Sequence, residues 1–271
     1  MVNSCHGRMG RAAAESVVDA GLELLPVTFT SDPSGGSVPV RGVEVALKGL
    51  DAMAGEVAAL KAAHPGLVVV DYTLPQAVVP NASLYASLDV PFVMGTTGGD
   101  RDALMARVRE AGTYAVISPN MGKQIVALQS MLEWAQASFP GAWQGYSLDV
   151  VESHQSTKVD TSGTAKALVQ SFEGLGLELQ EGGIEMVRDR EGQLGRMGVP
   201  EEHLDGHAFH TYTLTSPDGS VQFQFQHNVC GRRFYAEGTV DAVLFLASRV
   251  AANDPQRIFT MRDVLEAGAM R

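Results

Sequence analysis

The sequence predicts an α/β protein in two parts: a doubly wound parallel sheet, followed by a smaller mixed α/β part with an open sheet. Up to Asn120, short apolar runs alternate with longer helix-like stretches, and the runs are continuously apolar, as in strands buried on both faces. After Asn120, several strand-like runs are joined by loops such as Ser216–Gly219, which is typical of a mixed or antiparallel sheet. A chain of 271 residues can form two domains of this kind.

The first part is expected to alternate strands and helices. The strands are expected at Leu22–Thr30, Leu67–Thr73, Pro91–Thr97 and Tyr114–Ser118, and the helices at Arg8–Ala20, Leu50–Ala63, Gln76–Leu88 and Asp100–Ala111. Another strand should precede the glycine turn that begins at Ser4, but only Met1–Asn3 remain for it, and a strand typically spans ~5 residues. We therefore expect upstream residues, including the rest of this strand, to be missing from the sequence.

The second part is expected to contain more strands than helices. Its helices are expected at Gln124–Ser138 and Ala165–Phe172, and its strands at Tyr146–Val151, Ile184–Arg188, His207–Thr215, Val221–Val229 and Arg233–Glu237. The last helices, Val240–Val250 and Met261–Ala267, are expected to pack back on the first part. The expected domains are therefore residues 1–122 completed by 240–271, and residues 123–239.

Composition excludes several classes of protein. The formal charge of −11 and the pI near 5.0 argue against a nucleic-acid partner or an anionic membrane surface, because an acidic protein repels both. Cys5 and Cys230 are too few and too widely spaced for a disulfide framework, which suits a reducing compartment. No apolar run approaches the ~18 residues of a membrane span.

Ser4-Cys5-His6-Gly7-Arg8-Met9-Gly10 has the position of a dinucleotide-binding loop, between a strand and a helix. Gly7 would let the backbone approach a pyrophosphate, and Gly10 would permit close packing of helix on sheet. Serine replaces the first glycine, which the turn tolerates if the φ of Ser4 is negative. By itself such a pattern is weak, because an ordinary turn before a helix explains it equally well.

Further polar loops follow later strands of the predicted parallel sheet, where ligands of such sheets bind. Gly95-Thr96-Thr97-Gly98 and Ser118-Pro119-Asn120-Met121-Gly122 offer hydroxyls, amides and exposed backbone for a nicotinamide and its ribose. The segment after the second strand, Phe29-Thr30-Ser31, carries hydroxyls where NAD sites usually carry an acid, so NADPH is expected to be accepted and NADH stays possible. Asp32 either faces the ribose or only begins the next turn.

The run from Glu152 to Ala165 combines an imidazole, an ammonium and the start of a helix. Backbone N–H groups of Gly163 and Thr164 can bind a carboxylate at the positive end of the helix dipole, with Lys158 supplying a full charge. His154 can exchange a proton near neutral pH. Taken singly, these residues suit a helix cap, a surface charge and a strand end; as a set, they indicate an anion-binding catalytic site.

Two groups of residues could suggest other chemistry. The spacing of His203, His207 and His210 resembles a metal site, but Gly206 and a strand-like stretch separate them, so an ordinary loop before a strand is favoured and no metal is expected. Cys230 has no activating neighbour in the sequence and is interpreted as a structural thiol.

Together these motifs resemble the dihydrodipicolinate reductase family, also called the 4-hydroxy-tetrahydrodipicolinate reductases. The resemblance covers essentially the whole chain and includes Gly7–Gly10, Asp71–Pro75, Gly95–Gly98, Ser118–Asn120 and the Glu152–Thr164 run. Met121–Gln124, Val199–His203 and His227–Arg232 are similar to the plant and algal branch.

The resemblance implies a Rossmann-like coenzyme domain and reduction, by NADPH or NADH, of 4-hydroxy-tetrahydrodipicolinate by way of dihydrodipicolinate in the diaminopimelate route to lysine. It also implies a small dicarboxylate substrate, no nucleic-acid or membrane partner, a homo-oligomer (dimer or tetramer), and a plastid stroma location for a plant or algal protein, or otherwise a cytoplasmic one. Its catalytic pair corresponds to His154 and Lys158, and its substrate binders to Gln155, Ser162, Gly163 and Thr164. Its coenzyme contacts correspond to Ser4, Cys5, His6, Gly7, Arg8, Met9, Phe29, Thr30, Ser31, Tyr72, Thr73, Gly95, Thr96, Thr97, Ser118, Pro119, Asn120 and Met121.

The chain departs from the family pattern at two places. Many bacterial members have a second histidine after the catalytic one, where this chain has Gln155, and a proline before Ser-Gly-Thr that is missing after Thr161. Two other functions stay open: a semialdehyde dehydrogenase, which needs a nucleophilic cysteine near Ser118–Gly122, and a non-catalytic NADPH-binding sensor. The joint presence of His154 and Lys158 argues against the sensor.

Overall fold

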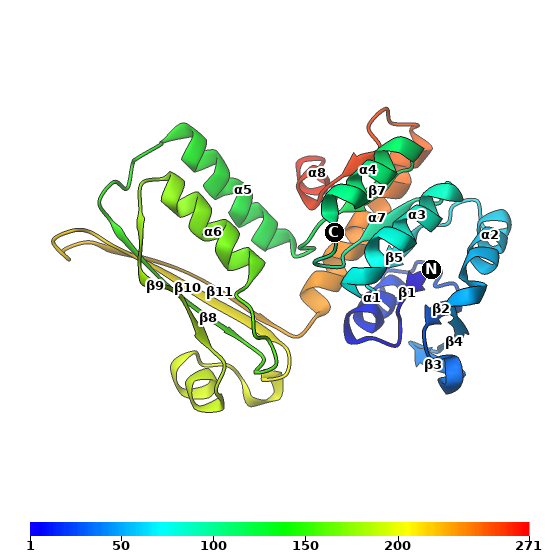
Figure 1. Ribbon diagram of the computed structural model, residues 1–271, viewed down its shortest axis with the longest axis horizontal. Helices are drawn as coiled ribbons and strands as arrows, with labels where there is room; N and C mark the ends of the chain where they lie inside the picture. Colours follow the sequence, from blue (N-terminus) through cyan, green and yellow to red (C-terminus); the bar gives the residue numbers. More distant parts are fainter. Residues whose placement is uncertain (271) are drawn as a thin grey trace. The chain divides into compact units, whose positions relative to one another are not determined.

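The computed structural model describes residues 1–270 and divides the chain into two compact units (Figure 1). The first unit combines Met1–Val126 with the chain from Arg232 onward, and the second is Ala127–Gly231. The crossings therefore differ from the expected domain boundaries at 122/123 and 239/240. The second crossing moves because α7 (Arg233–Ala251) is one continuous helix that belongs to the first unit.

A five-stranded parallel sheet forms the centre of the first unit. Its order is β1-β5-β6-β7-β12, with bounds Val2–Asn3, Val69–Asp71, Phe92–Met94, Ala115–Ile117 and Ile258–Phe259. All four neighbouring pairs are parallel. This confirms the predicted parallel sheet, although β12 was not predicted.

Both faces of this sheet are covered by helices. On one face α1 (Arg8–Asp19), α7 and α8 (Met261–Glu266) pack around Val70, Val93 and Val116. On the other face α2 (Met53–Ala63), α3 (Val78–Ser87) and α4 (Arg101–Ala111) pack around Val69, Phe92, Ala115 and Ile117. Successive residues of a strand point to opposite faces, so continuous apolar runs are what a doubly covered sheet requires.

A separate three-stranded sheet lies in the first unit, with order β2-β4-β3. Its strands are β2 (Val27–Thr30), β3 (Ser37–Val40) and β4 (Val43–Gly49), and only β2 was predicted. Pro39 and the Arg41-Gly42 turn interrupt the apolar pattern of β3 and β4, and this concealed both strands. Three short helical turns join the elements of this unit: η1 (Pro33–Gly35), η2 (Leu50–Ala52) and η3 (Pro75–Ala77).

The prediction of a strand at Arg233–Glu237 is wrong, because this segment is the beginning of α7. Arg233 and Glu237 form an ion pair with 2.8 Å between Nε and Oε1, the i,i+4 spacing of a helix. Gly238 lies so close to the carbonyl oxygen of Met121 that a Cβ would overlap it, which lets the helix approach the chain there. Short apolar runs such as Phe234–Ala236 do not distinguish strand from helix.

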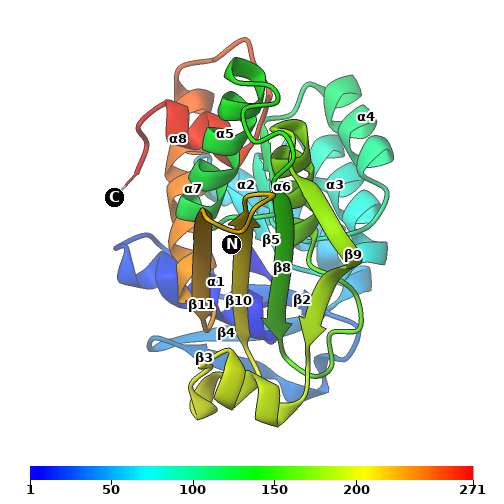
Figure 2. The ribbon, with the colours of Figure 1, turned by 90° about the vertical axis from the view of Figure 1, so that its left-hand side faces the viewer.

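The second unit contains a four-stranded mixed sheet, shown face-on in Figure 2. Its order is β11-β10-β8-β9, with bounds Gln222–Cys230, His207–Thr215, Ser147–His154 and Glu178–Val187. Strand β10 is antiparallel to both neighbours, and β9 runs parallel to β8. This confirms the predicted mixed sheet.

Helix α6 (Gly163–Gly174) makes the crossover between β8 and β9, and α5 (Lys123–Ser138) leads into the unit. One face of the sheet forms the larger core with these helices, through Leu132, Leu148, Val150, Leu168, Phe172, Tyr212 and Leu214. The opposite face has a smaller core with η4 (Gly192–Arg196) and η5 (Glu201–His203) nearby in the chain. None of the described helices is long and apolar enough to cross a membrane.

Candidate active site

Four of the predicted coenzyme loops lie at one edge of the parallel sheet. Ser4–Gly10 follows β1, Tyr72–Thr73 follows β5, Gly95–Thr97 follows β6, and Ser118–Met121 follows β7. These strands are successive neighbours and run in one direction, so their carboxyl ends meet at the same edge. This is where ligands of open parallel sheets bind.

The glycine loop departs from expectation at Ser4, whose φ is 64° rather than negative. An L-residue costs ~1–2 kcal/mol in this left-handed region. Two hydrogen bonds of 3.0 Å hold the turn, from the Ser4 amide to Asn3 Oδ1 and from the Gly7 amide to the Ser4 carbonyl. A Cβ on Gly10 would overlap the Ser4 carbonyl, so α1 packs directly against this loop.

A pocket of about 600 Å³ opens beside the glycine loop and the end of β2. Its polar side includes Ser4, His6, Thr30, Ser31 and Thr73, all of which were predicted to bind coenzyme. Its apolar lining consists of Phe29, Leu50, Met53, Ala54, Leu74, Ala77, Pro80 and Leu84. An apolar slot with hydroxyls on one side fits a flat base and its ribose.

Asp32 does not line this pocket, and no carboxylate does so in residues 1–270. Its Oδ1 accepts the Ser34 amide at 3.0 Å and so begins the short turn η1. Hydrogen bonds from Ser34 also hold the pKa of Asp32 below its usual value. Of the two interpretations of Asp32, the structure favours the turn.

A buried carboxylate fixes the loop after β5. Asp71 accepts hydrogen bonds from Tyr85 Oη at 2.7 Å, from Asn81 Nδ2 at 2.9 Å, and from Thr73 through Oγ1 at 2.6 Å and its amide at 3.0 Å. These four hydrogen bonds fix the Asp71 carboxylate, and two of them hold Thr73 at the pocket rim.

The predicted residues Tyr72 and Gly95 contact each other. The Tyr72 hydroxyl lies 2.5 Å from Thr239 Oγ1, and burial raises its pKa well above the usual value. Its ring occupies the space that a Cβ on Gly95 would need. Tyr72 therefore acts as a rigid neighbour of the Gly95–Thr97 loop, and any residue larger than glycine at position 95 would displace it.

Two predicted coenzyme residues have their side chains in the core. Cys5 is fully buried, and burial raises the pKa of its thiol to about 11, while Met121 is 2% exposed. Only their backbone groups are available to a ligand. In the loop after β7, Ser118 Oγ donates to the Asn120 carbonyl and Asn120 Oδ1 accepts the Gly122 amide, both at 2.8 Å.

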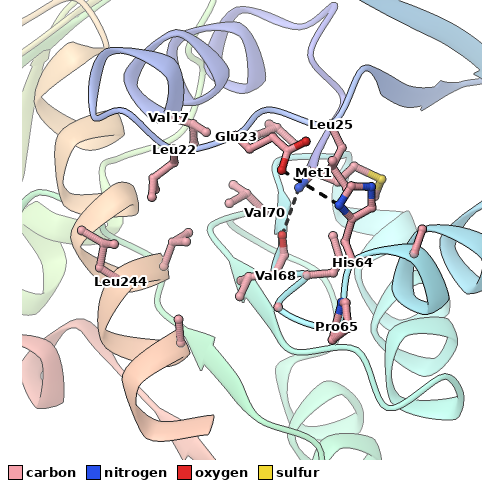
Figure 3. Close-up of a pocket in the computed structure, with 16 residues that line it drawn as sticks. Met1, Val17, Leu22, Glu23, Leu25, His64, Pro65, Val68, Val70 and Leu244 are labelled. Atoms are coloured by element: carbon pink, nitrogen blue, oxygen red, sulfur yellow. Dashed lines mark hydrogen bonds and ion pairs between the residues drawn. The ribbon is translucent and has the colours of Figure 1, made fainter. Parts of the chain in front are cut away.

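A second cavity of about 410 Å³ lies at the opposite, amino end of these strands (Figure 3). Its lining is mainly apolar, with Val17, Leu22, Val68 and Leu244 among the residues, and the Met1 amino group donates to the Val68 carbonyl at 3.1 Å. The cavity is far from the loops named above in the topology of the sheet and holds none of the predicted site residues.

In the second unit, β8 carries the predicted acid–base residue at its carboxyl end. His154 is 9% exposed, and its Nδ1 lies 3.1 Å from the carbonyl oxygen of His207. Its Nε2 lies 3.0 Å from Nε2 of His210, on the neighbouring strand β10. Burial, helped by the charges of Arg188 and Lys158, lowers the pKa of His154 to about 4.

A buried ion pair organises the loop after His154. Glu152 is fully buried, pairs with Arg188 at the end of β9, and accepts the Ser162 amide at 3.0 Å. Arg188 also donates from Nε to the Lys158 carbonyl at 2.9 Å. The pair therefore fixes both ends of the segment that carries Lys158 and the Ser-Gly-Thr turn.

The Ser-Gly-Thr turn begins helix α6. Ser162 is its N-cap, with Oγ 3.5 Å from the Ala165 amide, and Gly163 and Thr164 are the first helical residues. A Cβ on Gly163 would meet nothing within 4 Å, so there is open space beside the first turn. Lys158 lies in the preceding loop with Nζ 2.6 Å from Asp160 Oδ1, and Gln155 begins that loop.

Sequence reasoning missed His210, Arg188 and Gln193. Gln193 donates to the His154 carbonyl at 2.8 Å. A signal for His210 existed in the alternation of β10, which places it on the same sheet face as His154, but it was considered only as a metal ligand with His203 and His207. Those three do not come together: His207 Nδ1 bonds the His203 carbonyl, and its Nε2 lies 2.7 Å from Ser153 Oγ.

Ligand atoms of Glu152, His154 and His210 lie within 4.8 Å of one another, which is a spacing that a metal ion could use. Hydrogen bonds account for the cluster without an ion, since Glu152 binds Arg188 and the Ser162 amide, and the two imidazoles bind each other. A guanidinium beside the carboxylate also opposes a cation there. The expectation of no metal stays a prediction.

Comparison with known families decides between the open functions. The model of the dihydrodipicolinate reductase N-terminus matches residues 1–121, and that of its C-terminus matches residues 125–265. The chain belongs to the dihydrodipicolinate reductase family. It is 52% identical over its whole length to 4-hydroxy-tetrahydrodipicolinate reductase 1, chloroplastic, of Arabidopsis thaliana, covering 78% of that protein, and 31% identical to the Methanopyrus kandleri 4-hydroxy-tetrahydrodipicolinate reductase, covering 97% of this chain and 94% of that one.

Solved structures show the same fold. A dipicolinate-bound dihydrodipicolinate reductase from Paenisporosarcina sp. TG-14 aligns with a TM-score of 0.65 at 18% identity, covering 96% of each chain. The WlbA dehydrogenase from Thermus thermophilus, in complex with NAD and alpha-ketoglutarate, aligns with a TM-score of 0.52 at 10% identity, covering 98% of this chain and 91% of that one.

These findings confirm the predicted family, the Rossmann-like fold with its mixed second sheet, and the assignment as a reductase that uses a pyridine nucleotide. The semialdehyde dehydrogenase and the non-catalytic sensor are not supported. The roles of single residues are not tested by these similarities and are proposed below.

Proposed function

We propose that His154 and Lys158 carry out the chemistry of the family reaction in this chain, with the first unit (Met1–Val126 and the chain from Arg232 onward) binding the coenzyme and the second unit (Ala127–Gly231) binding the substrate. The reaction is the NAD(P)H-dependent reduction of 4-hydroxy-tetrahydrodipicolinate, by way of dihydrodipicolinate, to tetrahydrodipicolinate in the diaminopimelate route of lysine biosynthesis. The observation that carries the assignment is the common location of His154, Lys158 and the start of α6, all held by the Glu152–Arg188 pair.

The substrate is a small dicarboxylate, and the second unit offers two kinds of anion partner. The N–H groups of Gly163 and Thr164 form the first turn of α6, where the helix dipole attracts a carboxylate. Lys158 adds a full charge, and its present partner Asp160 is largely exposed, so an anion can replace it at little cost. Ser162 and Gln155 complete the proposed set, through the helix cap and a side-chain amide.

Protonation completes the reduction. When bound, the nicotinamide coenzyme would supply a hydride to the unsaturated ring. As negative charge develops on the conjugated imine side, Lys158 stabilises it and His154 gives a proton to it. Because burial favours the uncharged imidazole, the dianionic substrate must raise the proton affinity of His154 before it can act as the acid.

The coenzyme is proposed to bind along the carboxyl edge of the first sheet. The predicted contacts at Ser4–Met9, Tyr72–Thr73, Gly95–Thr97 and Ser118–Met121 follow neighbouring strands of this sheet. Phe29–Ser31 lie at the end of β2 in the three-stranded sheet, and a pocket suited to a base and ribose lies between them and the loop after β1. Since Asp32 caps its own turn, no carboxylate repels a 2′-phosphate in the described pocket. We infer that NADPH is used at least as well as NADH.

The names of the relatives bear on the location of the protein. The plant relatives are named chloroplastic, and this supports the predicted plastid location. A homo-oligomer remains a proposal, which sedimentation of the purified protein would test.

The assignment of His154 predicts that His154→Gln folds and binds coenzyme but loses turnover by a factor on the order of 100 or more, because general acid catalysis contributes that much. The measurement is NADPH oxidation coupled to dihydrodipicolinate synthase with pyruvate and aspartate semialdehyde. Circular dichroism and coenzyme fluorescence check the fold. A near-normal rate would remove His154 from the mechanism.

A further inference from the structure

Three imidazoles, of which His154 and His210 are buried and His227 is half-buried, come together on one face of the second sheet. In the strand register His210 pairs with His227 of β11 on one side and with Glu152 of β8 on the other, two residues before His154. The rings of His210 and His227 have centroids 4.6 Å apart, and those of His154 and His210 are 5.1 Å apart. His210 is 1% exposed and makes its two ring hydrogen bonds to His154 and, at 3.1 Å, to the hydroxyl of Tyr212.

The donor and the acceptor of each of these hydrogen bonds follow from the His207 carbonyl, at one end of the hydrogen-bonded series. The His207 carbonyl can only accept, so His154 carries its proton on Nδ1. A neutral His154 then has a lone pair on Nε2 and accepts from Nε2–H of His210. His210, also neutral, has a lone pair on Nδ1 and accepts from the Tyr212 hydroxyl. Every donor in this series of hydrogen bonds, from Tyr212 to the His207 carbonyl, therefore has an acceptor.

The same three groups can also serve a protonated His154. When Nε2 of His154 gains a proton, it must donate, so His210 must present a lone pair on Nε2 and carry its own proton on Nδ1. The Tyr212 hydroxyl then turns from donor to acceptor, which a hydroxyl can do without moving its oxygen. In both charge states each ring nitrogen of His154 therefore keeps a hydrogen-bond partner, although no ionised side chain touches these nitrogens.

We propose that His210, supported by Tyr212, is a positioning residue for proton transfer by His154, because its ring can donate to the neutral form and accept from the charged form. This inference rests on the proposed role of His154 as the acid. One proton enters from solvent and binds Nδ1 of His210, whose own Nε2 proton moves to Nε2 of His154. On reduction the Nε2–H group of His154 gives up its hydrogen bond to His210, the N–H bond breaks, and a bond from the proton to the ring of the substrate forms beside the one made by the hydride. His154 is then neutral again, and His210 returns to its Nε2–H tautomer by proton exchange with solvent.

Several charged or titratable groups surround the pair and enter its pH dependence. Strand β8 contributes Glu152, the loop after β8 contributes Lys158, and Arg188 directly follows β9; the two cations oppose protonation of His154. Strand β10 contributes His207 and Tyr212, and β11 contributes His227. The substrate dianion is the compensating charge. Because a hydrogen bond to a charged partner is roughly twice as strong as a neutral one, loss of His210 penalises the protonated state more.

The test is the pH profile of kcat in His210→Phe. The acid form of His154 is needed, so kcat falls as pH rises through its pKa; loss of the acceptor lowers that pKa. We expect the alkaline limb of the kcat profile, where kcat falls as pH rises, to move about one pH unit to lower pH. At pH 7 kcat should fall about tenfold, with KM for substrate changed less than twofold. Tyr212→Phe, which keeps the ring and protects the fold, should shift the limb in the same direction by less.

Two variants separate this role from a merely structural one. His210→Gln offers either an N–H or a carbonyl to His154 and should restore the limb. Ser153→Ala also leaves a buried imidazole short of a hydrogen bond, that of His207, one residue from His154 but on the opposite face, and should leave the limb unchanged. The inference is overturned if His210→Phe and Tyr212→Phe keep the parent profile, or if Ser153→Ala shifts it equally. A fully active His154→Gln would overturn the proposed function instead.

Discussion

At the residue scale, we predict that single side chains at the end of β2 decide the choice of coenzyme. Thr30 and Ser31 line the pocket, and the carboxylate that follows them in the sequence, that of Asp32, accepts the Ser34 amide. We predict that kcat/KM for NADPH at least equals kcat/KM for NADH in the parent. Ser31→Asp should lower kcat/KM at least tenfold for NADPH and not for NADH, because a carboxylate repels a 2′-phosphate. The measurement is a comparison of the two coenzymes at constant ionic strength.

A matched control for this prediction is Ser34→Asp, which adds the same charge outside the pocket. It should change the ratio of the two coenzymes by less than Ser31→Asp does. A clear NADH preference in the parent would mean that Asp32 leaves its turn and contacts the ribose.

Also at the residue scale, Lys158 and Thr164 are predicted to bind the same dianion. Lys158→Ala should weaken substrate binding and slow the chemical step, since its charge matters most when the ring gains electrons. Thr164→Val keeps the backbone N–H and should mainly raise KM, by the ~1.5–3 kcal/mol of a hydrogen bond to a charged group. Inhibition by pyridine-2,6-dicarboxylate, a flat dicarboxylate, should weaken in both variants.

Lys166→Ala provides the control for charge, because Lys166 lies on the exposed side of α6 in the same region. The inhibition constant of pyridine-2,6-dicarboxylate for Lys166→Ala should stay within about twofold of that for the parent, since exposed charges are screened. Equal inhibition of the parent, Lys158→Ala and Thr164→Val would show that these residues do not bind the carboxylates.

At the scale of elements, one ion pair joins β8, β9 and the loop before α6. Arg188→Met would leave the carboxylate of Glu152 buried without its partner, and breaking a buried pair costs ~3–5 kcal/mol. We predict that the free energy of unfolding falls by about that amount and that KM for substrate rises, because Ser162 and Lys158 lose their common anchor. Urea unfolding and steady-state kinetics measure the two effects.

Arg190→Met is the control, because Arg190 is two residues away and its pair with Glu201 is exposed. Exposed pairs contribute little, so its unfolding should match the parent within experimental error. If both variants unfold alike, the buried pair does not hold the loop.

The same elements show what sequence reasoning can reach. The loops after β1, β5, β6 and β7 could be predicted because each follows a continuous apolar run, and parallel order alone brings them to one edge. Partners from distant strands could not: Arg188 and His210 reach β8 only through the register of β9 and β10, which no local pattern encodes. Local patterns also failed where a run was short, as at Arg233–Glu237.

At the scale of the whole molecule, the buried histidines predict a loss of stability in acid. Burial lowers the pKa of His154 and of His227 to about 4. Burial, together with neighbouring charges, lowers the pKa of His210 to about 2. In the unfolded chain each has a pKa of about 6.5. Below that pH the unfolded state binds more protons, so stability is full above pH 6.5 and falls as pH drops toward 4.

His227 allows this to be tested without touching the proposed catalytic pair, since both of its ring nitrogens are buried and have no hydrogen-bond partner. His227→Phe should unfold at a higher temperature at pH 7, because it removes an unpaired buried polar group and keeps a flat ring beside His210 and Tyr212. It should also reduce the pH dependence of the free energy of unfolding by up to ~1.4 kcal/mol per pH unit between pH 6.5 and 4, the contribution of one proton. Calorimetry from pH 7.5 to 4.5 measures both, with His64→Gln in the first unit as the control that should leave the transition of the second unit unchanged. A parent that is equally stable at pH 4.5 and 7.5, or a His227→Phe variant with the full acid dependence, would show that these imidazoles are not held neutral in the folded protein.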